Sequence, residues 1–168
     1  KAASHKYREQ DGRTALISRT ASMISGKGMI LTNSAGNTGA AEWKRIGFPG
    51  DAHDVLTVGA LAPDSTNTTF SSVGPTYDGR VKPDVMAMGG YCTVINGKGL
   101  VAHANGTSFS TPITCGLVAC LWQALPNKTA SEIMQLVRES ADRADYPDNI
   151  FGYGIPDFWK AYQMGLNK

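Results

Sequence analysis

The most constraining feature of this sequence is the short run VLTVGAL at residues 55–61, which has no polar face. A strand that is apolar on both faces needs a covering layer on each side, and such strands belong mainly to parallel sheets. The segment MILTNS at 29–34 has a similar character and ends in a Gly-Asn turn. Together the two runs predict a mostly parallel sheet flanked by helices, which is an α/β fold.

Other patterns predict the remaining elements. Residues 13–27 place Leu16, Ile17, Ala21 and Ile24 at helical spacing. Residues 82–90 contain a third short strand, and residues 92–106 form a hairpin with a lengthened turn around Asn96-Gly97. A helix is predicted to begin near Ser108, with Pro112 in its first turn. Because its residues are mostly apolar on all sides, this helix is predicted to be buried. A capping box opens a helix over 129–141, and a short helix follows Pro156. Residues 1–12 have no apolar period and are expected to be exposed loop.

The composition excludes several classes of protein. The chain has 168 residues, as many as one domain needs, and a net charge of +2 without a basic run. Nothing therefore points to nucleic acid or to a membrane surface, and no apolar stretch could span a bilayer. The three cysteines lack the spacing of a disulfide framework, and Cys115 and Cys120 are expected to be small core residues. No cofactor and no metal site are predicted. Around Asp51 and Asp54, surface solvation is favoured over calcium binding.

The segment NGTSFSTP at 105–112 places Ser108 where an extended segment turns into a helix. The free N–H groups at a helix N-terminus could stabilise an oxyanion formed beside that serine. The Gly-x-Ser-x-Gly pattern of α/β-hydrolases is absent, however. Because serine is also a strong N-cap residue, local chemistry alone favours a cap over a nucleophile.

A second segment, NSAGNTG at 33–39, ends a predicted strand and contains Asn37. Asparagine is common in turns because its backbone tolerates unusual conformations. Its side-chain amide could equally donate a hydrogen bond to an oxyanion. Neither segment decides the function alone.

The two segments and the blocks between them resemble the C-terminal portion of the catalytic domain of a subtilisin-like serine peptidase, a subtilase. NGTSFSTP is similar to the nucleophile motif Gly-Thr-Ser-x-x-x-Pro of that family, and NSAGN is similar to its oxyanion-hole strand and turn. The blocks IGFPG, VLTVGAL, FSSVGP and KPDVMAMG follow in the family's order, and GYGIPDFWKA resembles its closing segment. The resemblance covers residues 18–162 and implies part of a doubly wound sheet in a single domain over residues 1–168.

The resemblance implies a role for each matching residue. Ser108 would be the nucleophile of a serine endopeptidase that forms an acyl-enzyme on polypeptide substrates. Asn37 and the Ser108 backbone N–H would form the oxyanion hole. Ala35 and Gly36 would form one wall of the specificity pocket, and Gly47 would lie at its floor, although Gly47 could equally be a plain turn glycine. The resemblance also implies export from the cytoplasm.

The catalytic base is missing from these motifs. The family's Asp and His come before the serine in the chain, in settings that neither Asp11, His5 nor His53 provides. His103 is five residues from Ser108, too far for a base if the segment is extended, and is expected to line the cleft rim. We therefore expect an N-terminally truncated, inactive half-site that lacks an upstream part and tends to self-associate. The alternatives are a non-catalytic subtilase-like binding or scaffold module and an unrelated helix-rich interaction domain.

Overall fold

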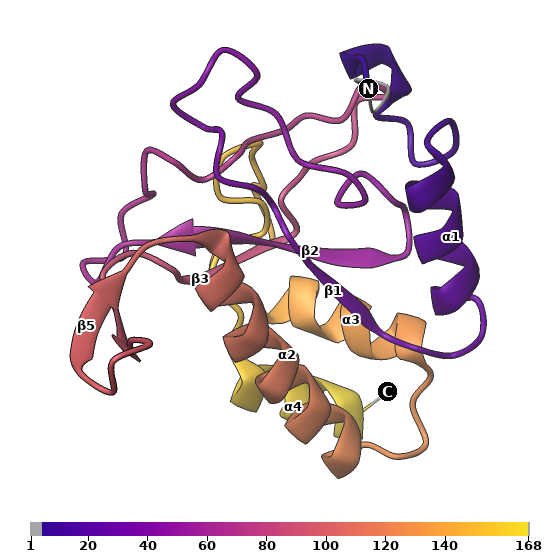
Figure 1. Cartoon of the computed structure of the whole chain (residues 1–168). Coiled ribbons are helices and arrows are strands. Elements are labelled where there is room, and N and C mark those ends of the chain that lie inside the picture. The colour runs from indigo at the N-terminus through magenta and orange to yellow at the C-terminus, as the bar shows by residue number, and fades with distance from the viewer. Residues whose placement is uncertain (1–4, 168) are drawn as a thin grey trace.

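The computed structural model describes residues 5–167 (Figure 1). A short 3-10 helix at Tyr7–Glu9 precedes the main elements. In chain order these are α1 (Leu16–Ser25), β1 (Leu31–Ser34), β2 (Val55–Leu61), β3 (Val85–Met88), β4 (Cys92–Ile95), β5 (Val101–Ala104), α2 (Thr107–Ala124), α3 (Ala130–Ser140) and α4 (Phe158–Leu166). None of these helices is both long enough and apolar enough to cross a membrane.

The first three strands form one parallel sheet in the order β1-β2-β3. Leu31 pairs with Val55, and Val58 pairs with Val85, so the three strands share one direction. Every residue of β2 is buried, as its unbroken apolar run predicts. β1 is only half-buried, contrary to the prediction, because it pairs on one side only.

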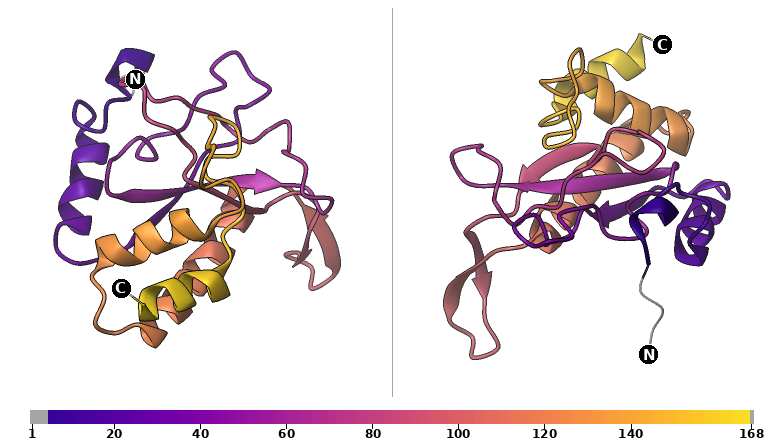
Figure 2. Two further views of the ribbon diagram at one scale, coloured as in Figure 1. Left: turned by 180° about the vertical axis from the view of Figure 1, so that it is seen from behind. Right: turned by 90° about the horizontal axis from the view of Figure 1, so that it is seen from above.

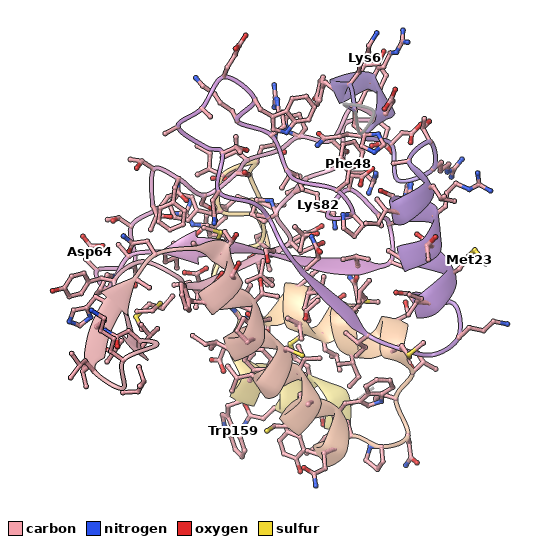
Figure 3. All side chains as sticks on the ribbon, in the orientation of Figure 1. Lys6, Met23, Phe48, Asp64, Lys82 and Trp159 are labelled. Atoms are coloured by element: carbon pink, nitrogen blue, oxygen red, sulfur yellow. The ribbon has the colours of Figure 1, made fainter. Side chains whose placement is uncertain are left out.

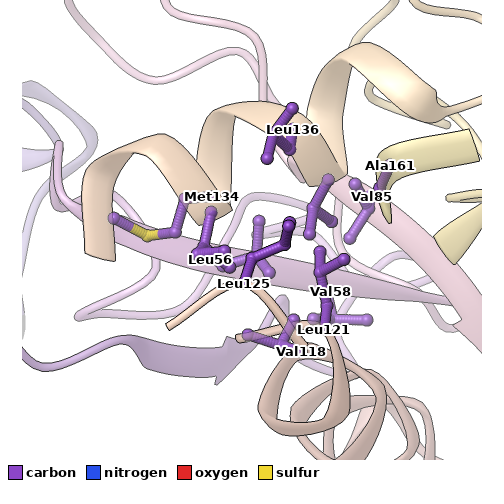
Figure 4. Packing of buried hydrophobic residues seen from close by; sticks show 11 residues of the cluster. Leu56, Val58, Val85, Val118, Leu121, Leu125, Met134, Leu136 and Ala161 are labelled. Carbon is purple, nitrogen blue, oxygen red and sulfur yellow. The ribbon is translucent and has the colours of Figure 1, made fainter. Parts of the chain in front are cut away.

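Helices cover both faces of this sheet, which confirms the predicted α/β class. Leu56 and Val58 point from β2 into a core shared with α2, α3 and α4 (Figure 4). Val55 points to the opposite face, where it packs with Ala21 of α1. Successive side chains of β2 therefore point into two different layers, and the strand is fully buried because both faces of the sheet are covered.

Local sequence signals set the start of the two C-terminal helices. Thr129 caps α3: its hydroxyl accepts from the Glu132 N–H, and the Glu132 carboxylate accepts from the Thr129 N–H at 2.7 Å. The Thr129 N–H and hydroxyl both donate to the Glu132 carboxylate, and these two hydrogen bonds lower the pKa of Glu132. Asp157 caps α4 by accepting from the Lys160 N–H. The predicted capping box is confirmed, and α4 begins just after Pro156 as expected.

The long helix α2 differs from its prediction in two respects. It begins at Thr107, so Pro112 is the sixth helical residue and lies in the second turn. There the missing proline N–H leaves the Ser108 carbonyl without its usual helical donor. The helix is also buried on one side only, and Cys115 and Cys120 are exposed rather than part of the core. Its apolar outer surface has no covering layer within residues 5–167.

The N-terminal segment corrects two further expectations. Leu16 is 72% exposed and Ile17 is 52% exposed, whereas Ser18 and Ala21 form the buried side of α1. Gln10 was predicted to lie in exposed loop, but its side chain is fully buried and donates a hydrogen bond to the Ile46 carbonyl. The part of the predicted loop at residues 1–4 lies outside the described residues.

The strands β4 and β5 form the predicted antiparallel hairpin, with Cys92 opposite Ala104. The hairpin projects away from the helical layers in both views of Figure 2. Its return strand, β5, runs directly into the segment that precedes α2. The hairpin therefore stands beside the N-terminus of the helix that carries Ser108.

Candidate active site

Ser108 lies in the first turn of α2 but does not cap it. The N-cap is Gly106, and Ser108 is the second helical residue. Its side chain is exposed, and among residues 5–167 neither its hydroxyl nor its backbone N–H has a hydrogen-bond partner. A capping serine would accept a hydrogen bond from the first turn, so the structure contradicts the N-cap explanation of this residue.

Asn37 is fixed against the start of the same helix by Thr107. Its side-chain oxygen accepts from the Thr107 backbone N–H at 2.9 Å and from the Thr107 hydroxyl at 2.8 Å. With the oxygen held in this way, the amide nitrogen of Asn37 lies beside Gly106, 3.3 Å from where a Cβ would stand there. No acceptor within the described chain takes the hydrogens of that nitrogen. Two N–H donors, one from Asn37 and one from Ser108, are thus unoccupied near the serine hydroxyl.

Ser72 holds the turn that carries Asn37 in place by hydrogen bonds. The Gly36 carbonyl accepts from the Ser72 N–H, and the Ser72 hydroxyl lies 2.9 Å from the Thr38 hydroxyl. Gly36 has φ +110°, and an added Cβ would lie 2.9 Å from the Ser72 Oγ atom. Only glycine fits this turn without strain. Thr107 also reaches it, because its hydroxyl accepts from the Gly36 N–H at 3.2 Å.

Ala35 and Gly47, which are both expected to line the specificity pocket, lie side by side. The Gly47 N–H donates to the Ala35 carbonyl at 2.8 Å, and Ala35 is completely buried. A Cβ on Gly47 would meet only the Ala35 carbonyl, at 3.7 Å. The structure therefore brings Ala35, Gly36 and Gly47 together.

This arrangement has a definite chemical capacity. The hydroxyl of Ser108 stands at the N-terminal end of a helix of 18 residues, where the helix dipole favours negative charge. Donors fixed before the reaction stabilise an oxyanion at little reorganisation cost. The constellation can therefore accept an oxyanion generated by attack of the serine hydroxyl on a carbonyl.

No histidine of the chain serves Ser108 as a base. The chain has three histidines, all within the described residues, and none hydrogen-bonds to Ser108. His5 pairs with Glu9 at 2.9 Å, and His53 contacts the Asp11 carbonyl at 3.2 Å. His103 stacks on the Tyr91 ring, with centroids 4.0 Å apart.

The structure also corrects the reading of Asp51 as a solvated residue. Asp51 is fully buried, and its carboxylate accepts from the Gly12 N–H and the Ser18 hydroxyl, which ties the N-terminal segment and α1 to the loop before β2. Asp54 is exposed, as expected. Among residues 5–167 no cluster of three His, Cys, Asp or Glu side chains could hold a metal ion.

Two residues of the site were not identified from the sequence. In the sequence, Thr107 stands out only as part of the nucleophile motif, and Ser72 only as part of the block FSSVGP. Both act through hydrogen bonds to segments 34 or more residues away in the chain. The signal for Thr107 is its place directly before the serine, where a hydroxyl can reach the facing turn.

Comparisons with known proteins identify the family of this chain. The sequence model described as the subtilase family, Peptidase S8, matches residues 3–154. The chain belongs to the subtilase family. It is 33% identical over 149 residues to serine protease AprX of Bacillus subtilis, an alignment that covers 76% of this chain and 34% of AprX. It is 28% identical over 152 residues to the membrane-bound transcription factor site-1 protease of Mus musculus, covering 84% of this chain and 14% of that protein.

Solved structures of low sequence identity confirm the fold. The self-cleaved protease domain of PatA superposes with a TM-score of 0.72 at 24% identity, covering 89% of this chain and 54% of that one. The epidermin leader peptide processing serine protease of Staphylococcus aureus gives a TM-score of 0.71 at 20% identity, covering 90% and 44%. The subtilase thus spans about a third of AprX and about half of these structures.

Proposed function

We propose that this subtilase is a serine endopeptidase that cleaves polypeptides through an acyl-enzyme on Ser108. Family membership supports serine peptidase chemistry in general. The observation that carries the proposal for these residues is the clamp of Thr107 on Asn37. It holds the amide oxygen by two hydrogen bonds and leaves the amide nitrogen free beside Gly106, two residues before the serine.

In the proposed reaction, the Ser108 oxygen attacks the carbonyl carbon of the scissile peptide bond. Negative charge then develops on the former carbonyl oxygen, which is bound by the Asn37 amide and the Ser108 N–H. Collapse of this intermediate releases the amine product and leaves the acyl group on Ser108, from which water removes it. Ala35 and Gly36 line the pocket for the substrate side chain, and the absence of a side chain on Gly47 leaves its floor open.

The general base is supplied from outside residues 5–167 in this proposal. The serine hydroxyl has no hydrogen-bonded base there, and a base must come within about 3 Å of the proton it removes. The resemblance places the Asp and His before this segment. We propose that the segment holds half of an active site, that it is inactive alone, and that its substrates are polypeptides met outside the cytoplasm.

Fluorophosphonate labelling read by intact mass tests this proposal. The chain alone and a protein extended upstream are each treated with the reagent. We expect the label on Ser108 only in the extended protein, where a base can activate the hydroxyl, and no label after Ser108→Ala.

Ser131 provides a matched control. It is exposed and is the second residue of α3, as Ser108 is of α2. Ser131→Ala should label like the wild type. Absence of label from a folded extended protein would reject the peptidase proposal and favour the binding or scaffold module, for which the lack of a base beside Ser108 is the supporting observation.

A further inference from the structure

A charged pocket lies at the opposite end of the sheet from Ser108. Its volume is about 250 Å³, and it is lined by His53, Arg80, Val81, Lys82, Asp84, Gln135, Arg138 and Tyr153. Thr57, near the start of β2, and Asp84, just before β3, mark this end, whereas β1 leads at its other end into the turn of Asn37. Asp84 is the only acidic residue among the described residues of the lining, against the three basic residues Arg80, Lys82 and Arg138.

The two most buried charged residues of this pocket, Lys82 and Asp84, are hydrogen-bonded to each other and to neighbouring groups. The Lys82 ammonium donates to the Val55 carbonyl, the Thr57 hydroxyl and, at 2.6 Å, the Asp84 carboxylate. Asp84 also accepts from the Thr57 N–H and from the Arg138 Nε–H at 2.9 Å. Figure 3 shows Lys82 within the body of the fold. Lys82 therefore adds charge but no free donor, and Asp84 has little capacity left to bind a cation.

The two guanidinium groups retain unused donors. Arg138 uses its Nε–H on Asp84, and Arg80 uses its Nε–H on Asp78 at 2.9 Å. The Nη2 atom of Arg80 is buried and has no hydrogen-bond partner within the described chain. The terminal nitrogens of Arg138 likewise have no acceptor among residues 5–167. The buried Nη2 atom lies against the Gly12 segment, out of reach of a ligand. The donors left for the pocket are therefore the Nη1 group of Arg80 and the two terminal nitrogens of Arg138, and an oxyanion among them would gain charge-assisted hydrogen bonds.

Nearby carboxylates do not accept hydrogen bonds from these free arginine donors. Asp78 is bonded to the Arg80 Nε–H and to the Thr76 hydroxyl. Asp51, although buried close by, directs its carboxylate to Gly12 and Ser18 and does not line the pocket. Three cations thus face two bonded carboxylates, and the remaining charge lies on groups that can only donate.

From this geometry we propose that the pocket binds a small oxyanion of the phosphate or sulfate type, held between Arg80 and Arg138. The two terminal nitrogens of Arg138 present paired N–H donors that match two oxygens of such an anion, and Arg80 adds its Nη1 group. The positive charge of Lys82 strengthens the attraction without contacting the ligand. Tyr153, whose hydroxyl has no partner in the described part of the chain, completes a set of donors around the space. Bound anion would join the loop before β3 to α3 and stabilise the fold by linkage.

Calorimetric titration of the full-length protein with inorganic phosphate, at constant ionic strength, tests the proposal. We expect saturable binding at one site and competition by sulfate. Arg80→Gln should raise the Kd about tenfold or more, because one charge-assisted hydrogen-bond donor group is lost. Arg143→Gln is the matched control: Arg143 also pairs with a single carboxylate, Asp148, but does not line the pocket.

Thermal unfolding separates specific binding from general salt effects. Phosphate and sulfate stabilise most folded proteins by exclusion from their surface, so the wild type alone is not informative. We expect the phosphate-induced rise in Tm to be smaller in Arg80→Gln than in Arg143→Gln. Equal rises in the two variants, or no saturable heat in the wild type, would overturn the proposal. If Arg80→Gln does not fold, Arg138→Lys replaces it in both measurements. This substitution keeps the positive charge opposite Asp84 but removes the paired N–H donors of the guanidinium.

Discussion

At the scale of single residues, Thr107 is the group on which the proposed oxyanion hole depends. Its hydroxyl donates to the Asn37 oxygen and accepts from the Gly36 N–H, so it links the donor side chain to the turn that carries it. Removal of the hydroxyl leaves Asn37 held by the Thr107 backbone N–H alone. The amide nitrogen would then sample orientations that do not face the oxyanion.

We therefore expect Thr107→Val to lower kcat about tenfold in the catalytically complete protein, the worth of one neutral hydrogen bond, with KM little changed. Thr107→Ser should restore most of the rate, since it keeps the hydroxyl. Asn37→Ala sets the upper limit of the loss, about 10²–10³-fold, a range that itself comes from a subtilisin. An unchanged kcat in Thr107→Val would show that Asn37 does not need this clamp.

The candidate residues of this site are easier to find in the sequence than the residues that hold them in place. Ser108, Asn37 and Gly36 stand in contiguous motifs, so a motif search finds them together with their neighbours. Ser72 and Asp51 bond to residues remote in the chain, and their burial depends on what the fold places above them. A polar residue looks the same in sequence whether it faces water or a buried partner, which is why Gln10 and Asp51 were expected at the surface.

At the scale of elements, the best-predicted helix is the one whose signals are local. The capping box of α3 needs only Thr129 and Glu132, three residues apart. The exposed faces of α1 and α2 were wrongly predicted because apolar spacing shows which residues could be buried, not which layer is present to bury them. The same limit applies to β1, which lacks a second neighbouring strand in the described sheet.

The cap of α3 gives a direct stability prediction. Thr129→Ala removes the hydroxyl that accepts from the Glu132 N–H, and should lower the free energy of unfolding by about 1 kcal/mol. Urea denaturation measures this loss, with Ser131→Ala, an exposed neighbour, as the control. Because alanine is a stronger helix former than serine, Ser131→Ala should not lower the stability. A loss in Ser131→Ala as large as that in Thr129→Ala would show that the lost cap is not the cause.

Asp84 links β2, α3 and the loop before β3, and its contacts predict that the stability of the fold is sensitive to acid. It joins β2 through the Thr57 N–H and α3 through Arg138, and it neutralises Lys82. Burial raises the pKa of Asp84, but the charges of Lys82 and Arg138 outweigh it, so the pKa lies below its ordinary value of 3.8. Since the folded-state pKa is depressed, this stabilisation is complete above the unfolded value near 4 and is lost as the pH falls further.

Asp84→Asn should therefore destabilise the protein by about 3–5 kcal/mol at pH 7, because it leaves the Lys82 ammonium buried without a counter-charge. The difference from the wild type should begin to shrink below pH 4, where the unfolded wild-type chain takes up a proton at Asp84, and should disappear only below the depressed pKa of the folded state. Urea denaturation at the two pH values checks both statements. Asp145→Asn, at an exposed position, should change stability by less than about 0.5 kcal/mol. A difference that persists unchanged at low pH would exclude charge pairing as its cause.

At the scale of the whole molecule, the described chain leaves an apolar surface open between α2 and α4. A groove of about 520 Å³ is lined there by Leu117, Cys120, Leu121, Ala124, Phe158, Trp159 and Tyr162. Trp159 is 67% exposed, and Figure 3 shows it at the outer surface of the helical layer. The edge of β1 also leaves backbone donors and acceptors unpaired by any described strand. Continuous apolar surface and an open strand edge both favour association.

We therefore expect the isolated chain to self-associate at high concentration, with a mass in static light scattering that rises with concentration. Trp159→Lys should reduce this rise, because it places a charge in the apolar groove. Tyr146→Lys is the control, since Tyr146 is 65% exposed but lies outside the groove. Equal reductions in the two variants would point to added net charge rather than to the groove. A monomer of constant mass in the wild type would show that the uncovered face of α2 and the open edge of β1 are tolerated in water.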